Sequence, residues 1–465
     1  MPRQGAIVAV LAIAGLASSF MFTLVVPIQS KLPELLDASR EDTAWVVTAT
    51  LLAAAVFTPI AGRLGDMYGK RRIVLVLLVL LMVGSVIAAL STGIVGVIVG
   101  RALQGAVTGV VPLGISIMRD VLHENRVDAA IALMSATLGV GGAVGMPVSA
   151  LITETSDWHV LFWMAAGLGA VVLVLVVLVV PPSVLRTPGR FDLVGAAGLA
   201  VGLTGVLLAV SRGSTWGWTS PATLACGVGG ILVLLVWGRY ELRITDPLLD
   251  LRVAARPAVL LTNLASVAIG FSLFASNVAY PQMLELPAAV GGFGLTLLQA
   301  SLVIMPAGLV MMVLSPFSGR LARSVGPRLL LVLGSIALIL AYGFSLLWAS
   351  EVWHLLVANL LIGVGIGFGY AGMPMLIMRS VPPTETGASN GLNALFRSLG
   401  TSTAAAVIGA VLAAFSIDRD GTAVPTPAAF QMSFALGLGA AVVALAVAVC
   451  IPQRRDRHET RPSMP

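Results

Sequence analysis

Charged residues, histidine and cysteine are scarce in this chain of 465 residues. Only 10% of the residues are charged and 58% are hydrophobic, which is more apolar side chain than the core of a water-soluble protein can bury. The two cysteines, Cys226 and Cys450, both lie within apolar runs, so neither a disulfide framework nor a zinc cluster is available. The sequence therefore predicts a protein whose solvent is lipid, with no metal and no cofactor.

Two further classes of protein lack their usual signals. A nucleic-acid-binding protein gathers its basic residues on one solvent face, but here the net charge of +6 comes from residues scattered between apolar runs. A membrane-embedded enzyme needs His, Asp, Ser or Cys side chains that converge at one depth, and the sequence offers no such cluster. We therefore expect a chain that binds no nucleic acid and is not an enzyme.

Apolar runs long enough for a membrane-spanning helix, about 20 residues, recur along the whole chain. Fourteen are expected, at residues 6–29, 43–61, 72–91, 93–118, 127–152, 160–181, 191–211, 222–240, 257–283, 296–318, 328–348, 353–378, 387–415 and 429–451. They predict an all-α polytopic membrane protein with 14 transmembrane helices. We expect a six-helix bundle in residues 1–185, an inserted helix pair in 186–252, a second six-helix bundle in 253–452 and a tail at 453–465.

The distribution of Lys and Arg predicts the orientation, because these residues stay in cytoplasmic loops during insertion. If both termini are cytoplasmic, 21 of the 27 basic residues fall on the cytoplasmic side and four on the outer side, with Arg101 and Arg397 inside spans. This bias predicts cytoplasmic termini and supports an even number of helices.

A short motif occurs twice, after the second helix of each expected bundle. The segment GRLGDMYGKR, which begins at Gly62, is echoed by GRLARSVGPR, which begins at Gly319. In the first copy, the glycines permit tight turns, and we expect Asp66 to lie near the bases Lys70 and Arg71 and near the inner end of the fourth helix. The repeat supports two similar halves of six helices each, separated by an insertion.

The helix pattern and this loop resemble the major facilitator superfamily, and specifically its fourteen-helix drug:proton antiporter family. The segment from Gly62 to Arg72 looks like the superfamily signature between helices two and three. The resemblance implies that the charged groups form a latch, which holds the inner ends of the helices together in the outward-open state. The alternative is that the bases serve positive-inside retention alone. The expected latch consists of Gly62, Asp66, Gly69, Lys70, Arg71, Arg119 and Asp120.

Polar residues within the apolar spans are candidates for a central cavity, because a buried polar side chain usually marks a proton or substrate route. Arg101 and Gln104 share one helix face and resemble the family's Arg-x-x-Gln-Gly motif. The alternative for all of these side chains is a role in helix packing. The predicted cavity and coupling residues are Arg101, Gln104, Asn277, Tyr280, Asn390, Asn393 and Arg397.

The fifth helix carries several glycines that resemble, imperfectly, the antiporter motif Gly-x-x-x-Gly-Pro-x-x-Gly-Gly. The residues in question are Gly141, Gly142, Gly145 and Pro147. They either allow the helix to flex or allow close packing against a neighbour.

The acid that proton-coupled relatives carry in helix one is missing. Alignment on Pro27 puts Ser18 at its position, and every Asp and Glu can be assigned to a loop or to the end of a span. Asp42 is the best remaining titratable candidate for coupling, with a helix N-cap as the alternative. A cavity with arginine and no acid disfavours cations, so we expect a neutral or anionic amphiphile as substrate, and we expect Ser18→Asp to increase export of cationic dyes.

These features predict a secondary active transporter that exports small amphipathic compounds, such as drugs, antibiotics or secreted metabolites, by alternating access coupled to protons. The family resemblance supplies the direction. The alternative is an uptake permease or an uncoupled facilitator of a small organic solute. We expect a monomer in the bacterial plasma (inner) membrane.

Overall fold

The computed structural model describes residues 4–25, 28–29, 31–183, 185–187, 189–419 and 422–452. The tail expected at 453–465 and Pro27, on which helix one was aligned, lie outside the described residues.

The predicted all-α membrane fold with 14 spans is confirmed, since 14 helices of the described chain are long and apolar enough to cross a bilayer. The fourth span bends through a 3-10 turn, because α6 (Ile94–Gly105) continues through η2 (Ala106–Gly109) into α7 (Val110–Val121). The other spans are α1 (Gln4–Thr23), α4 (Trp45–Tyr68), α5 (Lys70–Leu90), α8 (Glu124–Thr155), α9 (His159–Val179), α10 (Leu193–Trp216), α11 (Pro221–Glu241), α13 (Pro257–Glu285), α14 (Leu297–Val325), α15 (Pro327–Leu347), α16 (Val352–Ser380), α17 (Thr386–Ala414) and α18 (Pro427–Cys450).

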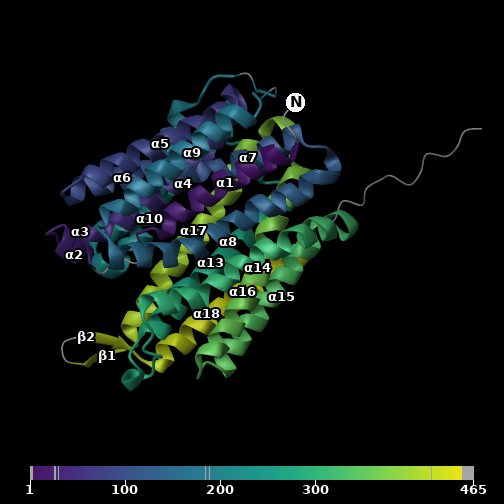
Figure 1. Ribbon diagram of the computed structural model, residues 1–465. Coiled ribbons are helices and arrows are strands. Elements are labelled where there is room, and N and C mark those ends of the chain that lie inside the picture. The colour runs from purple at the N-terminus through teal and green to yellow at the C-terminus, as the bar shows by residue number, and fades with distance from the viewer. Residues whose placement is uncertain are drawn as a thin grey trace, which may run out of the picture.

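Short elements connect the spans. They are α2 (Leu32–Leu35), α3 (Arg40–Thr43), α12 (Leu251–Ala254), η3 (Ala288–Val290), η4 (Pro383–Glu385) and an antiparallel hairpin of β1 (Ser416–Arg419) with β2 (Thr422–Pro425). The hairpin had no counterpart among the sequence predictions. Figure 1 shows it at the same end of the molecule as α2 and α3.

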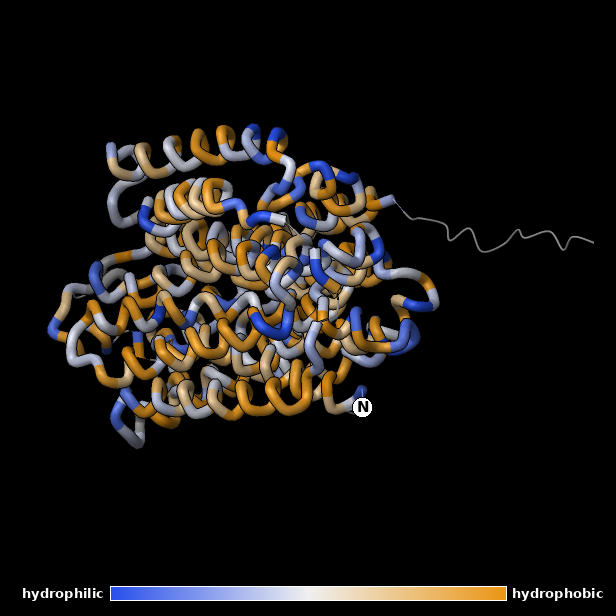
Figure 2. The backbone as a smooth tube through the Cα atoms, turned by 90° about the horizontal axis from the view of Figure 1, so that it is seen from above, coloured by the Kyte–Doolittle hydropathy of each residue, from blue (hydrophilic) through white to orange (hydrophobic). Residues whose placement is uncertain are grey.

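We call this end the outer end, and the opposite end, where α4 finishes and α5 begins, the inner end. The inner end is the one that the distribution of Lys and Arg predicts to be cytoplasmic. Figure 2 shows hydrophobic residues along the helices, with hydrophilic residues concentrated at their ends and in the loops.

The two copies of the repeated motif adopt the same backbone turn. Gly69 ends α4 and begins α5 with a φ of 107°, and Gly326 ends α14 and begins α15 with a φ of 93°. A side chain would be strained at these angles, so glycine is required at both turns. The internal repeat is therefore a structural repeat as well.

The chain forms two helical halves, which lie one above the other in Figure 1. We call residues 4–183 the N-terminal half and residues 257–451 the C-terminal half. One large cluster of buried apolar residues lies mostly in the N-terminal half and extends to Ala322 and Met375 of the other. A second cluster lies in the C-terminal half, apart from Ala136. The two halves meet chiefly along α8 with α14 and along α4 with α17.

The inserted pair, α10 and α11, lies against the outside of the α4–α17 contact. Buried side chains of α10, Leu199 and Leu203 among them, share an apolar cluster with Ala55 of α4 and Leu392 of α17. Helix α10 thus touches both halves, whereas α11 packs mainly against α10 and is otherwise exposed to the surroundings.

Candidate functional site

The carboxylate of Asp66, at the inner end of α4, caps the first turn of α17 in the opposite half. Its two oxygens accept hydrogen bonds from the backbone amides of Gly387, at 3.1 Å, and Ala388, at 2.8 Å. The side chain is fully buried. A helix N-terminus presents free N–H groups and a partial positive charge, so a buried anion at this position holds the two halves together.

Lys70 extends this contact. Its Nζ lies 2.6 Å from Oδ2 of Asp120, 3.9 Å from Oδ1 of Asp66, and 3.1 Å from the hydroxyl of Thr386, to which it donates. The lysine is buried as deeply as Asp66, and the nearby carboxylates compensate for the desolvation of its charge. Asp66, Lys70 and Asp120 therefore come together as a charged cluster against α17, which we call the inner latch.

Two predicted latch residues point elsewhere. Arg71 donates through Nη2 to the carbonyl of Val177, 2.6 Å away in its own half, and not to Asp66. Arg119 makes a contact of 3.4 Å with the sulfur of Met378 in the C-terminal half. Arg71 therefore joins α5 to α9 within the N-terminal half, whereas Arg119 contacts the opposite half.

The glycines of the motif permit close approach. A Cβ on Gly62 would overlap the backbone carbonyl of Gly387, and one on Gly387 would lie 2.7 Å from Oδ1 of Asp66. The two glycines face each other across the halves, so α4 reaches α17 closely enough for Asp66 to bond its amides.

A second set of contacts joins the halves at the inner end, and the sequence reasoning did not identify it. Arg379 of α16 pairs with Asp128 of α8 at 2.9 Å, and Arg323 of α14 donates to the carbonyl of Asn125. Arg323 occupies the place in the second motif that Asp66 has in the first, with opposite charge. This reversal of charge between the two copies of the motif is visible in the sequence and could have indicated a second contact between the halves.

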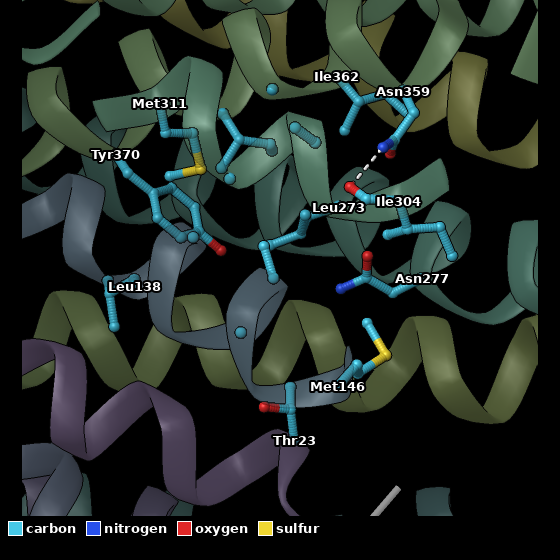
Figure 3. A pocket seen from close by; sticks show the side chains of 17 residues that line it. Thr23, Leu138, Met146, Leu273, Asn277, Ile304, Met311, Asn359, Ile362 and Tyr370 are labelled. Atoms are coloured by element: carbon cyan, nitrogen blue, oxygen red, sulfur yellow. Dashed lines mark hydrogen bonds between the residues drawn. The ribbon is translucent and has the colours of Figure 1, made fainter. Parts of the chain in front are cut away.

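A central cavity of about 100 Å³ lies between the halves, lined by α1, α8, α13, α14 and α16. The polar residues on its wall are Thr23, Asn277, Asn359 and Tyr370 (Figure 3). None of its described lining residues is charged. Sites for drug-sized ligands measure about 300 to 1,000 Å³, so the cavity must widen before it can hold such a molecule.

Three of these polar residues were absent from the sequence predictions. The amide of Asn359 donates to the carbonyl of Ile304 at 2.7 Å and so ties α16 to α14 (Figure 3). Tyr370 lies in an apolar, glycine-rich stretch, and Thr23 ends α1. Their positions in the sequence resemble those of packing residues, and only the fold brings them to the cavity.

A smaller cavity of about 10 Å³ lies next to the first, sharing Leu138 and Tyr370 as lining residues. Three of the predicted cavity residues, all from α17, line it: Asn390, Asn393 and Arg397. The guanidinium of Arg397 stacks on the ring of Tyr370, 4.8 Å from its centroid. Within the described part of the chain it makes no hydrogen bond and no ion pair.

The two asparagines of this stripe differ in their partners. Asn393 donates hydrogen bonds to Asn263 and Ser266 of α13, so its amide group joins α17 to α13 within the C-terminal half. Asn390 donates to the carbonyl of Thr386, but its Oδ1 is buried without a partner among the described residues.

Arg101 and Gln104 lie inside the N-terminal half and line neither of these two cavities. Arg101 is 1% exposed and donates to the carbonyl of Met21, at 2.8 Å, and to the side chain of Gln104, at 2.9 Å. Gln104 in turn donates to Ser85. The donors of Arg101 are satisfied within this half by the carbonyl of Met21 on α1, by that of Val46 on α4 and by Gln104. Ser18 is also buried, and bonds the carbonyl of Val107, so an acid at this position would not reach the described cavity walls.

Tyr280 and Asp42 are likewise placed away from both cavities. The hydroxyl of Tyr280 lies 2.8 Å from that of Ser345 and its ring packs edge-on to Phe434, deep in the C-terminal half. Asp42 is exposed at the outer end, where its carboxylate accepts a hydrogen bond from the hydroxyl of Ser39 at 2.7 Å. Asp42 lies within α3, and the hydroxyl of Ser39 accepts a hydrogen bond from its backbone amide at 3.0 Å, so Ser39 and not Asp42 caps this short helix. Asn277, by contrast, does line the larger cavity (Figure 3).

The glycines of α8 divide between packing and the cavity. A Cβ on Gly141 would lie 2.7 Å from the carbonyl of Leu16, and one on Gly145 would overlap the hydroxyl of Thr23. Both glycines therefore allow α1 to lie close. Gly142 lines the cavity, and Pro147 lies within the continuous helix α8.

Residues 11–405 and 264–464 of the chain match the family model of the Major Facilitator Superfamily. The chain belongs to this superfamily. Multidrug resistance protein Stp of Mycobacterium tuberculosis is 28% identical over 86% of this chain and 74% of its own length. Lincomycin resistance protein LmrB of Listeria monocytogenes is 26% identical over 94% of this chain and 95% of its own length.

Solved structures share the fold. The human organic anion transporter MFSD10 superposes with a TM-score of 0.66 at 14% identity, over 97% of this chain and 100% of its own. The proton:xylose symporter XylE superposes with a TM-score of 0.63 at 12% identity, over 94% of each chain. The protein is thus a multi-pass transporter of the major facilitator superfamily, with a cavity between two halves that are joined at the inner end.

Proposed function

We propose that the protein exports small amphipathic compounds, such as drugs or antibiotics, by alternating access in exchange for protons. The observation that carries the proposal is the cavity between the two halves, which are also joined at the inner end by the inner latch. Rocking of the halves about this cavity would expose it to one side at a time. The names of the relatives, which refer to multidrug and lincomycin resistance, support outward transport.

We further propose the setting in which the transporter acts. It lies in the inner membrane of a bacterium as a monomer, with both termini cytoplasmic, so that the latch closes the cytoplasmic side. The inserted pair in 186–252 separates a bundle in 1–185 from one in 253–452. This division is supported by the two large apolar clusters, one of which draws most of its residues from the N-terminal half and the other from the C-terminal half.

The charges along the cavities favour neutral or anionic substrates. Arg397, the charged residue on the wall of the smaller cavity, makes no ion pair within the described residues, and neither cavity has a carboxylate on its described wall. A cationic substrate would meet an uncompensated guanidinium in a site of low dielectric. An anionic substrate would instead gain a charged hydrogen bond, which contributes about 1.5 to 3 kcal/mol.

Transport of matched dyes tests this proposal. Inverted membrane vesicles that contain the protein are expected to accumulate an anionic amphiphilic dye when a proton gradient is imposed. Arg397→Gln should lower this uptake about tenfold or more, because a loss of 1.4 kcal/mol corresponds to a factor of ten. The matched control is Arg72→Gln, which neutralises an exposed arginine at the inner end and should leave uptake unchanged. Equal transport of a cationic dye by the wild type and Arg397→Gln would contradict the proposed selectivity.

The second candidate is an uptake permease or an uncoupled facilitator. The described wall of the central cavity lacks a carboxylate that could carry a coupling proton, and this observation favours the second candidate. A pH jump across proteoliposomes separates the two functions. Proton-coupled export predicts substrate movement against its gradient after the jump, whereas an uncoupled facilitator only equilibrates the substrate.

A further inference from the structure

Two carboxylates, Asp192 and Glu241, are buried together at the inner end of the inserted pair. Asp192 precedes α10 and is 8% exposed, and Glu241 ends α11 and is 3% exposed. The sequence assigned both to the ends of spans, where an acid normally reaches water. Their burial is therefore a result of the fold, and it costs free energy unless the two carboxylates are neutralised or hydrogen-bonded.

Each carboxylate has one oxygen with a partner. Oδ1 of Asp192 accepts a hydrogen bond from the amide of Gly195 at 2.8 Å and another from the hydroxyl of Tyr240 at 3.1 Å. Oε2 of Glu241 accepts the amide of Leu249 at 3.4 Å. These bonds fix the direction in which the two remaining oxygens point.

The remaining oxygens, Oδ2 of Asp192 and Oε1 of Glu241, are buried and make no hydrogen bond of good geometry among the described residues. The indole Nε1 of Trp237, which also lacks such a bond, approaches Glu241 and can neutralise no charge. A Cβ built on Gly195 would overlap both carboxylate oxygens, so the two oxygens face the same point above this glycine. Two ionised carboxylates in this position would repel each other, and each unpaired buried acceptor costs about 1 to 3 kcal/mol or more.

The surroundings supply no compensating charge. Neither carboxylate has an ion pair within the part of the chain that the structure describes, and Arg239 and Arg243 on the same segment are exposed. The groups that act on Glu241 are Asp192, the side chain of Trp237 and the backbone amides of Leu248 and Leu249, and none of these is basic. The titratable group nearest to the pair is Tyr240, whose hydroxyl already donates to Asp192.

We propose that Asp192 and Glu241 form a proton-binding site that holds one proton between Oδ2 and Oε1. A single proton turns one carboxylate into a donor for the other, so one O–H···O bond satisfies both unpartnered oxygens and removes one negative charge. The site is separate from the central cavity and from the inner latch. The proposal of this proton-binding site does not rest on the direction of transport or on the identity of the substrate.

The position of the site links its proton to the contact between the halves. Glu241 holds the amide of Leu249, and the side chains of Leu248 and Leu249 pack in the same cluster as Leu392 of α17. Loss of the proton would leave two facing negative charges in this cluster. We therefore expect residues 242–250 to loosen from α17 when the site is deprotonated.

Infrared difference spectroscopy of the wild type in nanodiscs tests the proposal directly. At neutral pH we expect a protonated carboxyl band that shifts in deuterated water, disappears as the pH is raised and is absent in Glu241→Gln. The matched control is Glu285→Gln, which changes the exposed glutamate that ends α13 and should keep the band.

Hydrogen–deuterium exchange gives a second readout that needs no variant. The protection factor of the Leu249 amide, which is its intrinsic exchange rate at each pH divided by the observed rate, should fall above the pH at which the band is lost, while amides of α15 keep their protection factors. A folded wild type without the band would mean that both groups are ionised and that water bridges them, which overturns the proposal. Stabilisation by sodium at constant pH, with no band, would also overturn it, because the occupant would then be a metal cation.

Discussion

The capping of α17 by Asp66 predicts a specific shift in conformation when the charge is removed. Asp66→Asn keeps the size of the side chain and one acceptor oxygen, but turns an amide group toward the second backbone N–H. The substitution removes one charged hydrogen bond, which stabilises the closed state by about 1.5 to 3 kcal/mol. It also removes the attraction between an anion and a helix N-terminus, which stabilises it by about 0.3 to 2 kcal/mol. Because neighbouring groups can partly adjust to the asparagine, we expect the free energy of the conformation closed at the inner end to rise by about 2 kcal/mol relative to the open one. The ratio of closed to open molecules should therefore fall about 30-fold.

Distances between spin labels across the inner end measure this ratio. After replacement of Cys226 and Cys450 by serine, labels at His123, which precedes α8, and Ser324, near the end of α14, lie on opposite halves at exposed positions. The wild type should give mainly the short distance, and Asp66→Asn should populate a longer one.

A matched substitution controls for the loss of a carboxylate as such. Asp157→Asn also neutralises an aspartate of the N-terminal half, but Asp157 is exposed at the outer end, where its carboxylate accepts a hydrogen bond from the amide of nearby His159. It should leave the distances unchanged. Identical distance distributions for the wild type and Asp66→Asn would refute the role of the cap in closing the inner end.

Two further substitutions follow from the packing. Gly62→Val should open the inner end in the same spin-label measurement, because the new side chain would overlap the backbone of Gly387; an unchanged short distance would show that the two helices need not approach so closely. Tyr280→Phe should lower the free energy of unfolding by about 1 kcal/mol, since its hydrogen bond to Ser345 is lost, yet leave transport intact. A loss of transport at an unchanged melting temperature would instead place Tyr280 on the transport route.

Two arginines within apolar spans, Arg101 and Arg397, illustrate how far the sequence could lead. Each lies inside an apolar span, and the cost of burying a guanidinium predicts a polar partner for both. Arg101 finds its partners in the carbonyl of Met21 and in Gln104, within one half, whereas Arg397 lies on the wall of a cavity between the halves. The sequence predicts that each arginine needs a polar partner, but it does not predict which residue that partner is. A partner such as Met21 lies on another helix, and long-range contacts decide how the helices pack.

The amino-acid sequence by itself determined the membrane class, the 14 spans and the two glycine turns, since these depend on run length and on backbone angles that are local. The tertiary structure alone decided that Asp66 caps a helix more than 300 residues away and that Asp192 and Glu241 are buried face to face. The physical reason is that the burial and the partners of a charged group depend on which helices pack around it, and helix packing is a property of the whole chain.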